Sequence, residues 1–404
     1  MSSGSGLAPR TTTPTDETRE SPWLYAVLAL LGTAGFFYVN LAAAIVDGLV
    51  GTLGFSSAQA GTVMSANIYG ASLGGLVAVF AVRRWPWRRS LLWLFAALVV
   101  VEAVSMFVHD YRALLALRAL DGLIGGLSVG IALSLLARTR FPDRAFGALL
   151  VFQFVFGGLG SWWLPGLVAT HGTWVLFACT TAMNVAALVA AAFVKVGAGR
   201  SDIPKATGVA GSNTTRLLTA FALLALFLFQ AANMGLFAFI IPLGQHYDLS
   251  LPFISRTVGL ATWIGTLGAA CVIVFGARMG RSKPLLLAMI VTVIGIGGFF
   301  WSDRPAIFFA ANASTAVTWS FVVPYLFGIV SALDRTGRLA TLAGFVSGLG
   351  LASGPLFAGW TVQPHDFVPL IATALVFFGI ATVAMLLAAA RVDRLGSQTM
   401  QEVT

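Results

Sequence analysis

Apolar stretches of about twenty residues recur along nearly the whole chain and are separated by short polar segments. A helix needs about 20 mostly apolar residues to cross the hydrocarbon core of a bilayer. Charged residues make up only 10% of the 404 positions, whereas soluble proteins carry about 25%. Because so few charges cannot cover a surface in water, we expect an all-α membrane protein whose outer surface faces lipid.

The apolar stretches predict twelve transmembrane helices. The expected spans in the first half of the chain are 24–46, 57–82, 90–108, 112–136, 145–168 and 173–194. Those in the second half are 216–243, 253–277, 284–301, 305–330, 338–360 and 367–390. The connection around Asp110 is short, which favours antiparallel neighbours on either side of it.

The net charge of +9 comes from Lys and Arg residues that lie in the connections. Positive residues collect on the cytoplasmic side of membrane proteins, so their distribution orients the chain. Most of the 24 Lys and Arg residues fall on one side when both termini are cytoplasmic, and this requires an even number of spans. We therefore expect a multi-pass protein of the bacterial inner membrane, surrounded by lipid and without a nucleic-acid partner.

The two halves of the chain share a weak internal repeat. One constant shift pairs Ser56 with Ser250, Leu73 with Leu267, Gly74 with Gly268 and Arg84 with Arg278. Many transporters are built from such repeats, and their substrate sites lie between the repeats. The repeat predicts two pseudo-symmetric halves of six helices each.

Composition sets the expected domain boundaries. Residues 1–22 are rich in Ser, Thr, Gly and Pro, which is typical of a disordered tail. We expect this tail in the cytoplasm, followed by the first half at 23–195 and a cytoplasmic linker at 196–215. The second half is then 216–391, and residues 392–404 form a second cytoplasmic tail.

Two motifs carry a resemblance to a known family. The connection after the second span reads Arg83-Arg84-Trp85-Pro86-Trp87-Arg88-Arg89, and the fourth span contains Arg118-Ala119-Leu120-Asp121-Gly122. With the repeat, these motifs make the chain resemble the major facilitator superfamily of twelve-helix carriers. The resemblance implies inner-gate loops that contain Arg84 and Arg88 in the first half, and Arg278, Gly280 and Arg281 in the second. Both loops lack the acidic residue of the family motif, so the resemblance implies that the lock that closes the inner gate differs here or is weaker.

The resemblance also implies secondary active transport by alternating access. Exporters of the family often carry a Gly-Pro pair in the fifth helix, whereas this chain has one in its predicted eleventh helix, at Gly354-Pro355. This difference favours proton-coupled uptake of a small organic solute. Proton-driven efflux of a small amphipathic compound is the alternative.

Few ionisable residues lie within the predicted spans, where they are costly and often functional. Glu102 and Arg118 are expected at a similar depth in neighbouring spans, and Asp121 lies one turn from Arg118 on the same helix face. We predict that these residues form a proton-coupling network; the alternative is a permanent ion pair that fixes the two helices. Asp47, at the outer end of the first span, is either a gating residue or a solvated helix-end residue.

Polar and aromatic stripes mark the expected substrate site. The resemblance implies that the first, fourth, seventh and tenth helices line a central cavity, and uncharged amides in a span must face inward. Hydrogen bonds between helices are the alternative role for these side chains. The predicted substrate contacts are Phe36, Asn40, Asn67, Gln153, Gln230, Asn233, Phe237, Asn312, Thr315 and Trp319.

The second half lacks charges in the middle of its spans, so we expect a neutral, monoanionic or weakly charged amphiphilic substrate. No nucleotide-binding loop or H-E-x-x-H motif is present, and Cys179 and Cys271 both fall in apolar stretches. We therefore expect no enzyme activity, no cofactor and no metal. A channel or a membrane-embedded sensor is the competing class. The expected partners are the solute, protons and lipid, and the carrier is expected to be a monomer.

Overall fold

The computed structural model describes residues 22–82, 84–194, 213–275, 280–333, 338–363 and 366–403. Helices account for nearly all of this part of the chain, apart from one bridge between Gln363 and Asp366. This confirms the predicted all-α class. Nearly all of the predicted tail 1–22, most of the linker 196–215 and the loop residue Arg278 lie outside the described residues.

The first half contains eight helical segments. They are α1 (Pro22–Ala34), α2 (Phe37–Asn40), α3 (Ala42–Gly51), α4 (Ser57–Ala81), α5 (Trp87–Ser105), α6 (Tyr111–Leu136), α7 (Pro142–His171) and α8 (Trp174–Phe193). α4 begins with a capping box in which Ser56 and Gln59 exchange hydrogen bonds, and α6 begins at Asp110, whose side chain accepts from the Ala113 amide. Such caps satisfy amides that have no partner within the helix.

The first predicted span, 24–46, is not one helix. The α-helical pattern breaks where the amide of Phe36 bonds to the Thr33 carbonyl and that of Leu41 bonds to the Tyr38 carbonyl, three residues back in each case. Gly35 lies at the first break, and a Cβ there would come within 2.7 Å of the Gly125 carbonyl oxygen. The two breaks place α2 as a short separate turn, which is the element that carries Asn40.

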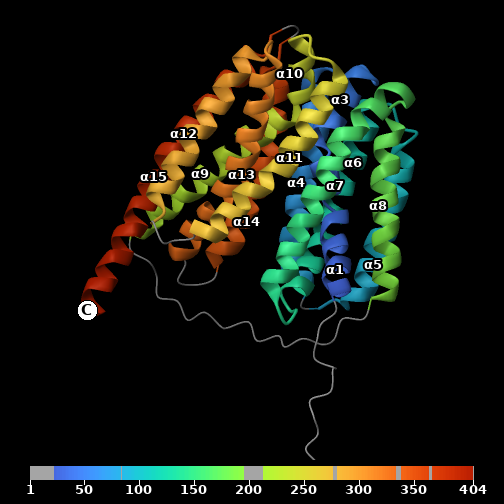
Figure 1. Ribbon diagram of the computed structural model, residues 1–404. Coiled ribbons are helices and arrows are strands. Elements are labelled where there is room, and N and C mark those ends of the chain that lie inside the picture. Colours follow the sequence, from blue (N-terminus) through green and yellow to red (C-terminus); the bar gives the residue numbers. More distant parts are fainter. Residues whose placement is uncertain are drawn as a thin grey trace, which may run out of the picture.

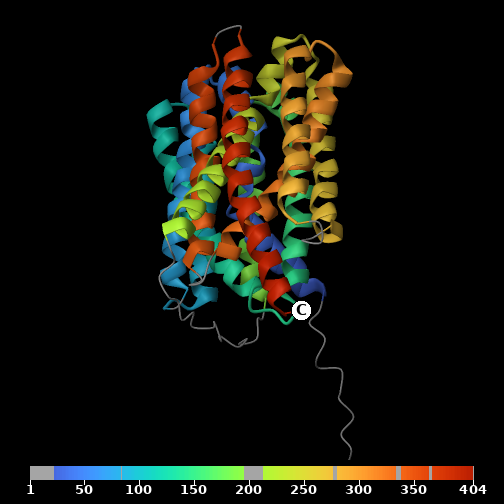
Figure 2. The ribbon, with the colours of Figure 1, turned by 90° about the vertical axis from the view of Figure 1, so that its left-hand side faces the viewer.

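The second half repeats this plan. Its segments are α9 (Asn213–Ala238), α10 (Ile240–His246), α11 (Leu251–Phe275), α12 (Ser282–Gly298), the 3-10 turn η1 (Phe299–Trp301), α13 (Pro305–Leu333), α14 (Arg338–Thr361) and α15 (Val368–Val403). Like the first span, the predicted seventh span is broken, at Phe239 between α9 and α10. α15 continues as a helix through the predicted tail 392–404 as far as Val403, and it runs from one end of the bundle to the other (Figure 2).

Each predicted span coincides with one helix or a row of shorter helices. Among the described residues, nine helices are long and apolar enough to cross a membrane by length and composition. The first span is divided between shorter helices, and α5 and α11 are the other two predicted spans outside this group of nine. The protein is thus a multi-pass helical membrane protein, while the count of twelve spans stays a prediction.

The two halves meet along two antiparallel helix pairs, α4 with α14 and α7 with α11. Glycines let these backbones approach closely, as small residues do in membrane helices. A Cβ on Gly61 would lie 2.2 Å from the Pro355 carbonyl oxygen, and one on Gly158 would lie 2.2 Å from Nε1 of Trp263. Tyr69 and Ser353 add a hydrogen bond of 2.7 Å between the halves.

The contacts between the halves are close at one end of the bundle, where α3 ends and α10 lies. Ser57 touches Gly359 there, and Trp162 packs on Gly259. Toward the other end, where α1 begins and α8 ends, α12 and α15 lean away from α5 and α8 (Figure 1). The halves therefore converge at the α3/α10 end and diverge toward the α1/α8 end.

Candidate functional site: a central cavity and a buried ion cluster

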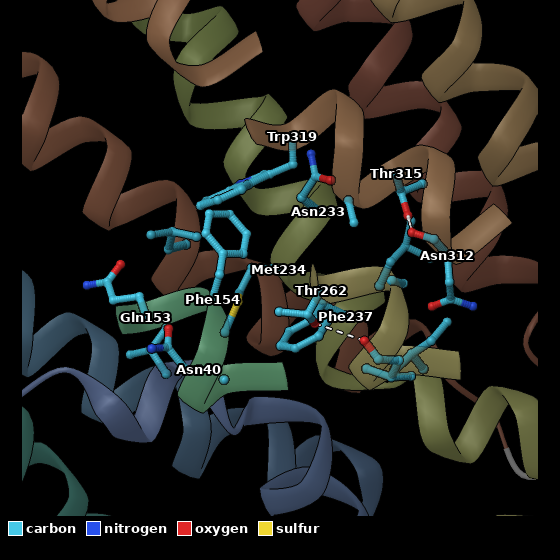
Figure 3. Close-up of a pocket in the computed structure, with 18 of the residues that line it drawn as sticks. Asn40, Gln153, Phe154, Asn233, Met234, Phe237, Thr262, Asn312, Thr315 and Trp319 are labelled. Carbon is cyan, nitrogen blue, oxygen red and sulfur yellow. Dashed lines mark hydrogen bonds between the residues drawn. The ribbon is translucent and has the colours of Figure 1, made fainter. Parts of the chain in front are cut away.

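A cavity of about 300 Å³ lies between the two halves. The first half contributes α2, α7 and the residue before α2; the second contributes α9, α10, α11, η1, α13 and α14. All but two of the predicted substrate contacts line it, and most of them are labelled in Figure 3: Phe36, Asn40, Gln153, Asn233, Phe237, Asn312, Thr315 and Trp319. The lining also contains Phe154, Met234 and Thr262, which the sequence analysis did not select.

The cavity lining combines aromatic rings with neutral polar groups. The rings of Phe154 and Trp319 line the cavity, and so do the amides of Asn40 and Gln153 from the first half (Figure 3). None of the described residues that line the cavity carries a charge. Pockets of this kind bind ligands mainly through apolar and aromatic contact, with a few polar groups that set orientation.

Two of the predicted substrate contacts lie outside the lining. Asn67 on α4 donates to Oδ2 of Asp121 at 2.8 Å and to the Arg118 carbonyl at 3.3 Å. Gln230 on α9 accepts from Nε1 of Trp319 at 2.8 Å and donates to Oγ of Ser347 at 2.8 Å. Both amides therefore make hydrogen bonds between helices, which was the alternative role considered for them.

Glu102, Arg118 and Asp121 come together in the first half, as the sequence predicts. Nη1 of Arg118 lies 3.0 Å from Oε2 of Glu102 and 3.5 Å from Oδ2 of Asp121. Nη2 of Arg118 donates to Oγ of Ser105 at 2.5 Å. Arg118 is fully buried, and Glu102 and Asp121 are at most 5% exposed.

Aromatic rings cover the guanidinium of Arg118. Its Cζ lies 5.1 Å from the ring centre of Tyr38 and 5.0 Å from that of Phe177, distances at which a cation is attracted to a ring face. Tyr38 belongs to α2, next to the cavity residue Asn40. The ion cluster and the cavity thus share the broken part of the first span.

The cluster holds two carboxyl groups and one cation. If both carboxyls are ionised, the buried charge sums to one negative, which is costly away from water. Oδ1 of Asp121 is buried and has no hydrogen-bond partner among the described residues. One proton on this pair of carboxyls makes the cluster neutral, so the geometry suits a group that gains and loses a proton.

Asp47 lies apart from both features. It is half-buried on α3 and belongs neither to the cavity lining nor to the groups that bind Arg118. Its gating role remains a prediction.

The predicted inner-gate loops lie at the α1/α8 end. Arg84 is exposed, and Arg88 donates to the Ala192 carbonyl at the end of α8, within its own half. In the second half, Gly280 has a φ of +72°, a conformation that favours glycine. The amide of Arg281, next in the chain, donates to the carboxylate of Asp393 at 2.9 Å.

Asp393 supplies a carboxylate that the second loop motif lacks. It accepts from the amide of Ser282 at 3.0 Å and from its hydroxyl at 2.6 Å, in addition to the Arg281 amide. The carboxylate thus caps the start of α12 from α15, far along the chain. The sequence alone does not indicate this role, because Asp393 falls in the stretch 392–404 that is expected to be a cytoplasmic tail.

Two helical halves around a central cavity, whose described lining holds no charge, are an arrangement typical of membrane transporters. The family model of the Major Facilitator Superfamily matches residues 26–355, so the chain belongs to this superfamily. A chloramphenicol resistance protein of Streptomyces lividans is 28% identical over 370 residues, which cover 84% of this chain and 88% of the relative.

Solved transporters share the fold. The nucleoside transporter NupG has a TM-score of 0.68 at 14% identity, with 91% of this chain and 98% of that chain covered. A D-xylose–proton symporter has a TM-score of 0.67 at 15% identity, with 92% and 97% covered. At these identities the likeness shows a shared fold and does not indicate which substrate this chain binds.

Proposed function

We propose that this transporter exports a small, neutral, amphipathic compound with an aromatic part, in exchange for protons. The observation that carries the substrate class is the central cavity, whose described lining is aromatic and amide-bearing and holds no charge. A charged ligand would lose its hydration there without a counter-charge, at a large free-energy cost. A neutral ligand loses much less and gains contact with the rings.

The proposed direction of transport is outward, whereas the sequence alone favours uptake. The relative from Streptomyces lividans is named for chloramphenicol resistance and matches most of this chain. A carrier of this superfamily protects a cell from a drug by moving it outward. Chloramphenicol or a compound of its class is therefore the first candidate substrate, and uptake is the second candidate.

The buried ion cluster supports proton coupling. Glu102 and Asp121 share one cation, Arg118, so that binding and release of a single proton changes the charge of the cluster. The ring of Tyr38 covers this cation, and the same short segment carries Asn40 into the cavity. We infer that occupancy of the cavity and protonation of the cluster act on each other through α2.

Membrane orientation follows from the charge distribution in the loops. With the α1/α8 end in the cytoplasm, the described arrangement opens inward, since the halves converge at the α3/α10 end. Such a state receives an exported compound from the cytoplasm or the inner leaflet.

Vesicles of both orientations test the proposal. We expect inverted membrane vesicles that contain the protein to accumulate labelled chloramphenicol when their interior is acidified, and a protonophore to abolish this accumulation. Accumulation only in right-side-out vesicles with an inward proton gradient would establish uptake instead. Counterflow of labelled against unlabelled compound in proteoliposomes separates a carrier from a channel, which does not concentrate the label.

A further inference from the structure

Four polar side chains of the second half line the cavity, and each donates a hydrogen bond to the backbone of its own helix. Asn233 donates through Nδ2 to the Phe229 carbonyl at 2.9 Å, and Asn312 donates through Nδ2 to the Phe308 carbonyl at 2.8 Å. Only the amide nitrogen can donate to a carbonyl, so this contact fixes the orientation of each amide. Each amide oxygen therefore points away from the carbonyl that its nitrogen binds.

The two threonines in the lining behave in the same way. Thr262 donates its hydroxyl to the Val258 carbonyl at 2.9 Å, and Thr315 donates to the carbonyls of Ala311 at 2.9 Å and Asn312 at 3.0 Å. A hydroxyl has one proton and two lone pairs. Once the proton is bound to the backbone, the oxygen offers only lone pairs to a ligand (Figure 3).

The ring donor on this side of the cavity is also occupied. The indole N–H of Trp319 is bound to the side-chain oxygen of Gln230, outside the cavity. No hydrogen bond from another described residue reaches the amide oxygens of Asn233 and Asn312. Each amide nitrogen keeps a second N–H, so each asparagine still offers one donor beside its oxygen, whereas the two threonines offer lone pairs alone. We call Asn233, Thr262, Asn312 and Thr315 the acceptor wall.

Asn40, on the first-half side of the cavity, is not restricted to accepting hydrogen bonds. The amide nitrogen of Asn40 is buried without a partner among the described residues, so nothing fixes whether this amide donates or accepts. The polarity that a ligand must match is therefore set by the second half.

We propose that the acceptor wall selects neutral ligands that carry several hydroxyl or N–H donors beside an aromatic group. Buried lone pairs that face an ether or ester oxygen stay unsatisfied, which is costly, whereas a hydroxyl or amide N–H satisfies them. The proposal rests on the proposed function and narrows its substrate class from amphipathic compounds to donor-rich ones.

Matched ligands and matched threonine variants test the wall. Chloramphenicol carries free hydroxyls, whereas its fully O-acetylated derivatives carry none; both keep the amide N–H, so the comparison changes the hydroxyl donors alone. We expect the purified protein to bind the parent compound about tenfold more tightly than the acetylated forms, as the loss of a satisfied buried hydrogen bond implies. Thr262→Val and Thr315→Val keep the side-chain shape but remove the acceptor, so each should reduce this ratio several-fold and leave the affinity for the acetylated forms unchanged.

Thr266→Val is the control variant. Thr266 lies one turn further along α11, is exposed, and donates to the Trp263 carbonyl, but it does not line the cavity. For this variant we expect the ratio of the affinity for the parent compound to that for the acetylated forms to equal the wild-type ratio. Equal binding of the parent and acetylated compounds by the wild type, or an unchanged ratio in both Thr→Val lining variants, would overturn the acceptor wall.

Failure of chloramphenicol to bind at all would count against the proposed compound class and leave the wall open to a separate test. Thermal shifts with matched aryl alcohols and their methyl ethers then decide. The wall stands if the alcohols stabilise the wild type more than the ethers and Thr315→Val removes the difference. It fails if the ethers stabilise equally, or if protonated aryl amines bind more tightly than the neutral alcohols.

Discussion

Trp319 donates its indole N–H to the side-chain oxygen of Gln230 across 2.8 Å, and the side-chain nitrogen of Gln230 donates in turn to Oγ of Ser347. The three residues lie on α13, α9 and α14. Ser347 precedes Gly348, which packs against Ser72 of the first half. The orientation of a ring in the cavity is therefore tied to a helix that forms the contact between the halves.

We expect Gln230→Leu to weaken binding of an aromatic ligand about tenfold. The change leaves the buried indole N–H without an acceptor, a loss of about 1–3 kcal/mol, so the ring of Trp319 no longer has a fixed orientation. Equilibrium binding of labelled chloramphenicol to purified protein measures the effect. In a Trp319→Phe background the same change should have a much smaller effect, because the partner N–H is already gone. Equal losses in both backgrounds would show that Gln230 acts elsewhere.

Asp121→Asn should uncouple transport from the proton gradient while the protein stays folded. Asn keeps the shape of the side chain but cannot bind and release the proton, and its oxygen can still accept from Asn67. Transport driven by a pH gradient should fall to the background level, whereas counterflow exchange should persist. Asp110→Asn on the same helix is the control, since Asn caps a helix as well as Asp does. Unchanged proton dependence in Asp121→Asn would remove this residue from the coupling step.

Removal of the cation should be far more damaging than removal of one carboxyl. Arg118→Gln leaves Glu102 and Asp121 facing each other without a counter-charge, and breaking a buried ion pair costs about 3–5 kcal/mol. We expect a markedly lower melting temperature in detergent. The double variant Arg118→Gln with Glu102→Gln should recover part of this loss, and no recovery would mean that packing around Arg118, not charge, sets the stability.

Gly61→Ala should favour the state in which the α3/α10 end is open. A methyl group at this position would lie 2.2 Å from the Pro355 carbonyl oxygen, so α4 and α14 cannot approach as closely. Labelling of a single cysteine at a cavity position, with reagents added from the outside, should become faster. Gly75→Ala on the same helix meets nothing within 4 Å and should label at the wild-type rate.

Asp393→Ala should destabilise the second half by about 1 kcal/mol, the usual effect of losing a side-chain cap on a helix start. The affected groups are the amides of Arg281 and Ser282. A lower melting temperature checks the expectation, with Asp303→Ala, an exposed position, as the control. An equal effect of both changes would mean that the cap contributes nothing.

The sequence predicts the helices well because their apolar length is imposed by the bilayer. It predicts the pairing of Glu102 with Arg118 because charges in spans have few possible partners. The sequence does not predict the break at Phe36, since a single glycine in an apolar stretch is tolerated within a helix and the bend depends on the approach of Gly35 to α6.

The amide residues show where helical spacing alone is insufficient. Gln230 and Asn233 are three residues apart and share a broad face of α9, yet only Asn233 reaches the cavity. Gln230 faces α13 and α14, whose positions the sequence does not give. Asp393 was missed for a similar reason, because its partners lie more than a hundred residues earlier in the chain.

The contact of Asp393 with the start of α12 has a consequence for synthesis of the chain. A ribosome must make α13, α14 and most of α15 before this carboxylate exists. Until then the first amides of α12 depend on water or lipid headgroups at the membrane surface. The start of α12 therefore acquires its cap only after Asp393 has been synthesised, and a nascent chain that stops before Asp393 lacks this cap.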